Sequence, residues 1–234
     1  MLLTYANFKA LKAAEFGYLQ CNIELASHKL SGFNVCKYED GCGIACIVNA
    51  GHGFFANVMA ARIKRTELFF SDRAAFFNIL IGEIYAAQVK AAEDDKNLCI
   101  RPNAFSDLPF FRIKHNGQTL FETFPDVQFF DYTKAPIEKI PTPGSISNYH
   151  LTKSAGASTT DAEIDAAISA GFNVAIPFEG PTLPTLYNGH PVLNGDTHDL
   201  RFKDPSGFVV GLLEKGNNQF KNAGRLSGFI RKAV

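Results

Sequence analysis

The chain has 234 residues, 46% of them hydrophobic and 20% charged, which is the balance of a globular protein that can bury a sizeable core. Basic and acidic residues number 23 each, and this zero net charge argues against strong non-specific binding of nucleic acid. No apolar run is long enough to span a bilayer, and neither a signal peptide nor a secreted disulfide framework is recognisable. We therefore expect no membrane contact and a cytoplasmic location.

The first part of the chain predicts a strand, a loop and two long helices. Residues 5–14 can form a short amphipathic helix, and residues 18–25 alternate in part as a strand does. A loop rich in glycine and cysteine follows at 32–53. Apolar residues then recur at helical spacing over 54–70, and Ser71 with Asp72 offers a cap for a second helix at 73–93.

Beyond this point, short apolar strands alternate with helix-length segments. The strands are predicted at 98–102, 127–132, 148–152 and 172–177. Such alternation is typical of βα units and a parallel sheet. The C-terminal part, 180–234, is irregular and begins with a long loop at 180–195. We expect a single α/β domain over 1–234, with mainly parallel strands that form an open or partial barrel.

Three of the five cysteines, Cys36, Cys42 and Cys46, lie in the glycine-rich loop with the spacing C-x5-C-x3-C. Thiolates this close in sequence can converge on one metal centre. A structural zinc site takes four protein ligands, whereas three thiolates leave one position open, which suits a 4Fe–4S cluster with one available iron. The spacing leaves two alternatives open: reduced thiols without a metal, and a zinc ion shared with a distant histidine or cysteine.

Polar residues follow the predicted strands at their carboxyl ends. In a parallel sheet these positions line one edge, where ligands bind, and the cysteines also follow a strand. We therefore expect a cofactor-binding set at this edge, composed of Asn103, Ser106, Asp107, Asp131, Lys134, Thr152, Ser154 and Glu179. Each residue has a plain structural alternative, such as a turn, a helix cap, a local ion pair or a solvated side chain.

A dense polar segment near the C-terminus contains Asp196, His198, Asp199 and Arg201. Two carboxylates beside a histidine can perform acid–base catalysis, because histidine titrates near physiological pH. Asp196, His198 and Asp199 are therefore candidate catalytic residues, and the alternative is a surface cluster of ion pairs. His150 lies inside a predicted strand and is expected to be a core histidine with satisfied hydrogen bonds.

Several long motifs resemble a family of uncharacterised proteins encoded by bacteriophages. The motifs are SGFNVC at 31–36, RPNAFSD at 101–107, FFDYTK at 129–134, NYHLTKS at 148–154 and GDTHDLRFKDPSGFVVGL at 195–212. The match extends over most of the chain, from about residue 31 to residue 213. The resemblance implies a viral protein in the host cytoplasm, and the family brings no established activity with it.

A more distant resemblance is to radical S-adenosylmethionine (SAM) enzymes, whose partial TIM barrel carries a three-cysteine loop after its first strand. It implies that the cysteines hold a 4Fe–4S cluster with S-adenosylmethionine at the open iron. Thr152 and Ser154 would then hold its ribose or carboxylate, and Glu179 would face its adenosine. The chain departs from the usual C-x3-C-x2-C spacing. It also lacks a clear glycine-glycine-acid motif after the second strand, where Asn103 and Asp107 stand instead.

Three functions follow from these observations. The first is a radical-SAM-like iron–sulfur enzyme that acts on a small molecule, such as a nucleotide or modified base. The second is a non-enzymatic phage protein on a degenerate barrel that binds a host factor or nucleic acid. The third is a zinc-stabilised or metal-free α/β enzyme that uses Asp196, His198 and Asp199.

Overall fold

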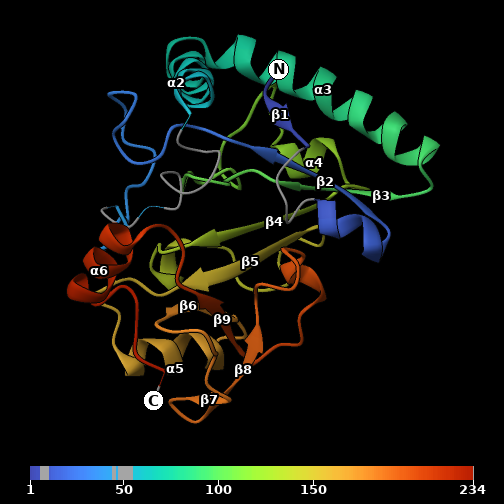
Figure 1. Cartoon of the computed structure of the whole chain (residues 1–234). Helices are drawn as coiled ribbons and strands as arrows, with labels where there is room; N and C mark the ends of the chain where they lie inside the picture. The colour runs from blue at the N-terminus through green and yellow to red at the C-terminus, as the bar shows by residue number, and fades with distance from the viewer. Residues whose placement is uncertain (6–10, 44–45, 47–54, 234) are drawn as a thin grey trace.

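The computed structural model describes residues 1–5, 11–43, 46 and 55–233, and their strands form one nine-stranded sheet (Figure 1). The strands are β1 (Leu3–Thr4), β2 (Tyr18–Ile23), β3 (Asn97–Arg101), β4 (Gln128–Thr133), β5 (Tyr149–Ser154), β6 (Val174–Phe178), β7 (Leu186–Tyr187), β8 (His190–Asn194) and β9 (Val209–Leu213). Their order across the sheet is β1-β2-β3-β4-β5-β6-β9-β8-β7. Neighbours between β2 and β8 are parallel, whereas β1 and β7 are antiparallel edge strands.

The predicted α/β class with a mainly parallel sheet is confirmed. Strands β2 to β6 lie side by side in chain order, so their carboxyl ends share one edge of the sheet, which we call the carboxyl edge. The sheet of the described residues ends in β1 on one side and β7 on the other, and it is not closed. The carboxyl edge is where a parallel sheet positions a site.

The prediction of a long loop at 180–195 is wrong, because β7 and β8 form an antiparallel hairpin there. Asn188 and Gly189 connect the two strands with positive φ angles of 49° and 77°. A two-residue type I′ turn requires such angles at both positions, and an Asn-Gly pair adopts them readily. The nearby prolines, Pro181, Pro184 and Pro191, hid this hairpin signal.

Two long helices match the predicted ones closely: α2 (Ala56–Ser71) and α3 (Arg73–Glu93). Asp72 separates them and caps α3, because its side chain accepts a hydrogen bond from the Ala75 N–H at 2.9 Å. No helix among the described residues is long and apolar enough to cross a membrane.

The remaining helices are short: α4 (Leu120–Thr123), α5 (Asp161–Ser169) and α6 (Asn218–Ser227), with 3-10 turns η1 (Ala13–Phe16), η4 (Ile137–Lys139) and η5 (Arg201–Lys203). A capping box of Thr160 and Glu163 begins α5, as the sequence predicts for that threonine. The α6 helix lies in the segment expected to be irregular. Of the predicted helix at 5–14, residues 6–10 lie outside the described part of the chain, and its end overlaps η1.

The main hydrophobic core lies on the face of the sheet that the helices cover. Ile100, Phe129 and Leu151 of the sheet pack there with the inner side of α3, which presents Phe76, Phe77, Leu80 and Ile84. Each such buried side chain contributes roughly 1.5–3 kcal/mol through the hydrophobic effect.

The opposite face of the sheet carries a row of polar side chains, and we call it the polar face. It contains Gln20, Asn22, Arg101, Tyr132, His150 and Thr152, which the strand register places on one side. Its apolar part is a small cluster formed by Ala13, Cys99, Phe130 and Leu200. Short segments that include η1 and η5 cover this face. The sheet is therefore apolar on its helical side and polar on the other.

Candidate functional site

The cysteine loop, residues 32–53, leaves β2 at the carboxyl edge; its residues 44–45 and 47–53 lie outside the described part of the chain. In Figure 1 the arrows of β4 and β5 point toward α6 and the loops around it. On one side of this edge, the Asp107 N–H donates to the Val35 carbonyl at 2.8 Å. On the other side, the N–H and hydroxyl of Ser158 donate to the Asp40 carboxylate at 2.9 and 2.8 Å. The loop therefore crosses from the end of β3 to the end of β5.

Two glycines allow the loop to dock this closely. A Cβ atom at Gly156 would collide with the Asp40 carboxylate, and one at Gly41 would lie 2.6 Å from the Cβ of Ala157. Gly41 also has a φ of 72°, a conformation that favours glycine. The anchor of the loop on the segment after β5 thus depends on the absence of side chains at both positions.

The thiol of Cys36 is held between backbone groups at the carboxyl edge. It donates to the Phe105 carbonyl at 3.7 Å and accepts a hydrogen bond from the His28 N–H at 3.3 Å. Burial raises the pKa of Cys36 to about 11, and the negative charges that Cys46 and Cys42 can carry act in the same direction. At pH 7 Cys36 is therefore protonated.

The donor chemistry of this loop fits a soft metal centre. All five cysteines are free thiols, and no three His, Cys, Asp or Glu side chains of the described residues already stand in a metal-binding arrangement. A cation would reverse the electrostatics at Cys36, because it stabilises neighbouring thiolates that otherwise repel one another. The three-cysteine ligand set predicted from the sequence stays a prediction.

The structure brings Asn103, Asp131 and Ser106 together at the carboxyl edge. The backbone N–H and the side-chain amide of Asn103 donate to the two carboxylate oxygens of Asp131 at 2.7 and 2.9 Å. The Asn103 side-chain oxygen Oδ1 accepts from the Ser106 hydroxyl at 2.7 Å. Burial raises the pKa of Asp131 to about 7, while the bonds from Asn103 and the charge of Arg101 oppose this shift. These residues tie the ends of β3 and β4 together.

Asp107 extends this network toward the cysteine loop. Its carboxylate accepts from the Thr133 hydroxyl at 2.7 Å and from the Lys134 N–H at 2.9 Å, while burial raises its pKa. The Lys134 ammonium lies 5.3 Å from the ring centre of Phe229. These polar groups already bond to one another. We therefore expect them to hold the loops in position.

The other predicted residues lie apart from this network. Thr152 is fully buried on the polar face, and the half-buried Ser154 ends β5. Glu179 follows β6 and forms an ion pair with Arg225 of α6 at 3.3 Å, while its N–H donates to the Arg231 carbonyl at 2.8 Å. Glu179 therefore anchors the C-terminal segment at the carboxyl edge.

The segment that contains Asp196, His198 and Asp199 sends its side chains to different places. Asp196 accepts from the Leu213 N–H at 2.8 Å and pairs with Lys215 at 2.6 Å. The His198 ring packs edge-on against Phe16, with ring centres 4.7 Å apart, and its Nδ1 lies 3.2 Å from Arg201 Nη2. Asp199 is buried and reaches the polar face.

Asp199 joins the polar residues of β2 and β3. Its carboxylate accepts from Arg101 Nη1 at 2.9 Å and from Gln20 Nε2 at 3.4 Å. Gln20 Nε2 also donates to Asn22 Oδ1 at 3.1 Å. The Arg101 guanidinium lies over the Tyr132 ring, 4.6 Å from its centre. Burial, followed by the charge of Asp199, raises the pKa of Tyr132, so the phenol stays protonated.

A second charged pair, Arg201 and Asp204, lies beside this network at 3.2 Å. Arg201 is fully buried and lies close to β5. Burial raises the pKa of Asp204 to about 6, although the charge of Arg201 opposes this shift. Burial and the same arginine charge lower the pKa of His150 to about 4, so its imidazole is neutral at pH 7.

The polar face differs from the carboxyl-edge network in having buried polar atoms without hydrogen-bond partners among the described residues. We call six of them the partnerless atoms: Gln20 Oε1, Asn22 Nδ2, Arg101 Nε, His150 Nε2, Thr152 Oγ1 and Arg201 Nε. Leaving one such group unpaired costs about 1–3 kcal/mol. His150 is therefore not the satisfied core histidine that the sequence suggested. A face that retains so many costly groups is a candidate ligand site.

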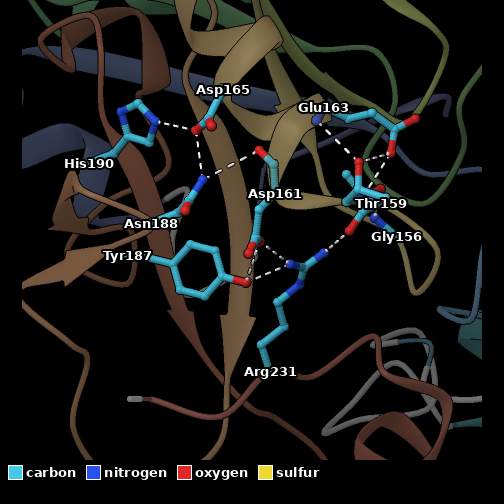
Figure 2. Close-up of polar contacts among 10 residues, drawn as sticks. Gly156, Thr159, Asp161, Glu163, Asp165, Tyr187, Asn188, His190 and Arg231 are labelled. Carbon is cyan, nitrogen blue, oxygen red and sulfur yellow. Dashed lines mark hydrogen bonds and ion pairs between the residues drawn. The ribbon is translucent and has the colours of Figure 1, made fainter.

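Figure 2 shows a contrasting cluster, near α5 and the β7–β8 hairpin, in which polar groups satisfy one another. Arg231 donates to the Tyr187 hydroxyl at 2.6 Å and contacts Asp161 at 3.4 Å. His190 Nε2 lies 2.7 Å from Asp165 Oδ1. The adjoining depression of about 420 Å³ is open and shallow. This cluster fastens the C-terminal segment to α5 and the hairpin.

Sequence reasoning missed Gln20, Asn22, Arg101 and Tyr132 as site residues, because it considered only positions after the strands. The available signal was the alternation of polar residues within β2, where Gln20 and Asn22 share one face of a buried strand. Such alternation of buried polar side chains is unusual without partners or a ligand.

A comparison with family models matches residues 1–233 to the family described as Gene product 88, and the chain belongs to this family. The predicted membership of a phage-type family is thereby confirmed. No curated protein and no solved structure matches the chain.

Proposed function

We propose that this member of the Gene product 88 family is a radical-SAM-like enzyme. In this proposal, Cys36, Cys42 and Cys46 hold an iron–sulfur cluster at the carboxyl edge, and the polar face takes a small polar molecule. The observation that carries the proposal is the path of the cysteine loop. It crosses the carboxyl edge between the ends of β3 and β5 and is anchored on both sides.

The chain's own residues would hold the centre and arrange what surrounds it. When bound, a cluster with one open iron would supply one-electron chemistry to S-adenosylmethionine. Asp107 fixes the cysteine loop through Val35, and Asn103 with Asp131 fixes the loop that carries Asp107. The η5 turn packs against β5 on the polar face, and exclusion of water from this part of the face would strengthen electrostatic contacts made there.

The test is metal analysis of anaerobically purified protein. We expect iron and sulfide in stoichiometric amounts, and their loss in Cys36→Ser, Cys42→Ser and Cys46→Ser. Cys99→Ala is the matched control, because it removes a buried thiol from the small cluster on the polar face and should keep the iron.

Two results would overturn the proposal. Stoichiometric zinc without iron would indicate a structural site, and protein without metal that retains none after reconstitution would leave the thiols unliganded. Equal iron loss in Cys99→Ala and the three loop variants would indicate general unfolding instead of loss of a ligand.

A further inference from the structure

We propose that the polar face binds an uncharged, planar heterocycle rich in hydrogen-bond acceptors, such as a nucleobase or nucleoside. This inference rests on the proposed function only in taking the polar face as the ligand site, and it requires no metal. It follows from the chemical identity of the partnerless atoms, the balance of charge around them and the stacked pair of Arg101 and Tyr132.

The orientation of the two amide side chains identifies one buried donor. Gln20 Nε2 faces the Asp199 carboxylate, which can only accept, so this atom is the amide nitrogen. The same nitrogen donates to Asn22, which must therefore present its oxygen to Gln20. Asn22 Nδ2 remains as a buried donor without a partner among the described residues.

Among the partnerless atoms, those that can only donate outnumber those that can only accept. Asn22 Nδ2, Arg101 Nε and Arg201 Nε can only donate, whereas Gln20 Oε1 can only accept. Thr152 Oγ1 can do either, and so can Nε2 of the neutral His150, according to its tautomer. A ligand that satisfies this set must offer mainly acceptors, as the carbonyl oxygens and ring nitrogens of a nucleobase do.

The charges of the two arginines are already balanced by aspartates. Arg101 is paired with Asp199 at 2.9 Å, and Arg201 is paired with Asp204 at 3.2 Å. An additional phosphate or carboxylate would enter a buried site beside two carboxyl groups, where both arginines are already paired. The cost of burying such a charge favours a ligand without net charge.

The shape of the Arg101 and Tyr132 pair suits a flat ligand. Arg101 and Asn22 face one another across neighbouring strands, as do Tyr132 and Thr152. The flat guanidinium of Arg101 already stacks on Tyr132, and both side chains are partly exposed. A planar ring can stack against this pair and receive bonds from the donors around it. The η5 turn packs against β5, the strand that carries His150 and Thr152.

In the experiment, the full chain is titrated with adenosine, guanosine, cytidine and uridine, and binding is measured by calorimetry and by NMR. We expect at least one nucleoside to bind, its monophosphate to bind at least tenfold more weakly, and ribose not to bind. Thr152→Val and Asn22→Leu should each weaken nucleoside binding at least tenfold. Thr123→Val, which alters a half-buried hydroxyl on α4, should leave it unchanged.

The inference is overturned if none of the four nucleosides binds, if the monophosphate binds as tightly, or if Thr152→Val binds like the parent. Metal analysis separates this failure from failure of the proposed function. Iron held without nucleoside binding would overturn only the ligand class, and nucleoside binding without iron would overturn only the cluster.

Discussion

Replacing Thr152 by valine tests the polar face with little change of shape, since one hydroxyl is exchanged for a methyl group. The Thr152 side chain is fully buried, and its hydroxyl is one of the partnerless atoms. Burying such a hydroxyl costs about 1–3 kcal/mol, so the valine variant should be more stable by that amount. For a chain of this length, the melting temperature should rise by about 2–12 °C.

Thr66→Val is the matched control for this prediction. Thr66 is equally buried, but its hydroxyl accepts from the Ala26 N–H and donates to the Arg62 carbonyl, both at 2.8 Å. Its removal leaves the buried Ala26 N–H unpaired, while the Arg62 carbonyl keeps its bond within α2, and should lower stability by about 1–3 kcal/mol. Thermal and urea unfolding of both variants measure the contrast. A fall in stability for Thr152→Val comparable to that for Thr66→Val would refute the reasoning.

Two further predictions concern the carboxyl edge. The pKa of Asp131 is raised to about 7 from an ordinary 3.8, so the folded state binds more protons in that range and its stability should fall as pH rises from about 4 to 7. Asp131→Asn should remove this pH dependence of the unfolding free energy, as measured by urea unfolding. Identical slopes of unfolding free energy against pH in both proteins would contradict the prediction. Gly156→Ala should push the Asp40 carboxylate away, lower stability by about 1–3 kcal/mol and reduce iron content. Gly82→Ala, in open space on α3, should instead stabilise by about 1 kcal/mol, and similar results for the two alanines would contradict the docking.

The parts of the fold that could be predicted are those governed by local signals. The two long helices have clear periodicity and an aspartate cap, and the βα alternation indicated a parallel sheet. That topology also explains why Asn103, Asp107 and Asp131 were expected at one edge and meet there. Their bonding to one another was not predictable, because it depends on how two loops pack.

The polar face could not be assembled from the sequence because its contacts join distant segments. Asp199 reaches Arg101 and Gln20 across 98 and 179 positions of the chain. The sequence identified Asp199 as one of several polar residues in its segment. It could not show that Asp196 bonds to Leu213 while His198 contacts Arg201. Which side of β5 His150 faces became clear only from the register with β4.

Electron paramagnetic resonance tests most directly whether the loop cysteines hold an iron–sulfur cluster with an open iron. The spectrum is recorded on the anaerobically purified, chemically reduced protein, with and without S-adenosylmethionine. We expect an iron–sulfur signal that changes when S-adenosylmethionine is added and that is absent from Cys36→Ser. A cluster signal that S-adenosylmethionine leaves unchanged would contradict an open iron at the carboxyl edge. The lack of any cluster signal in protein reconstituted with iron and sulfide would contradict the iron–sulfur account altogether.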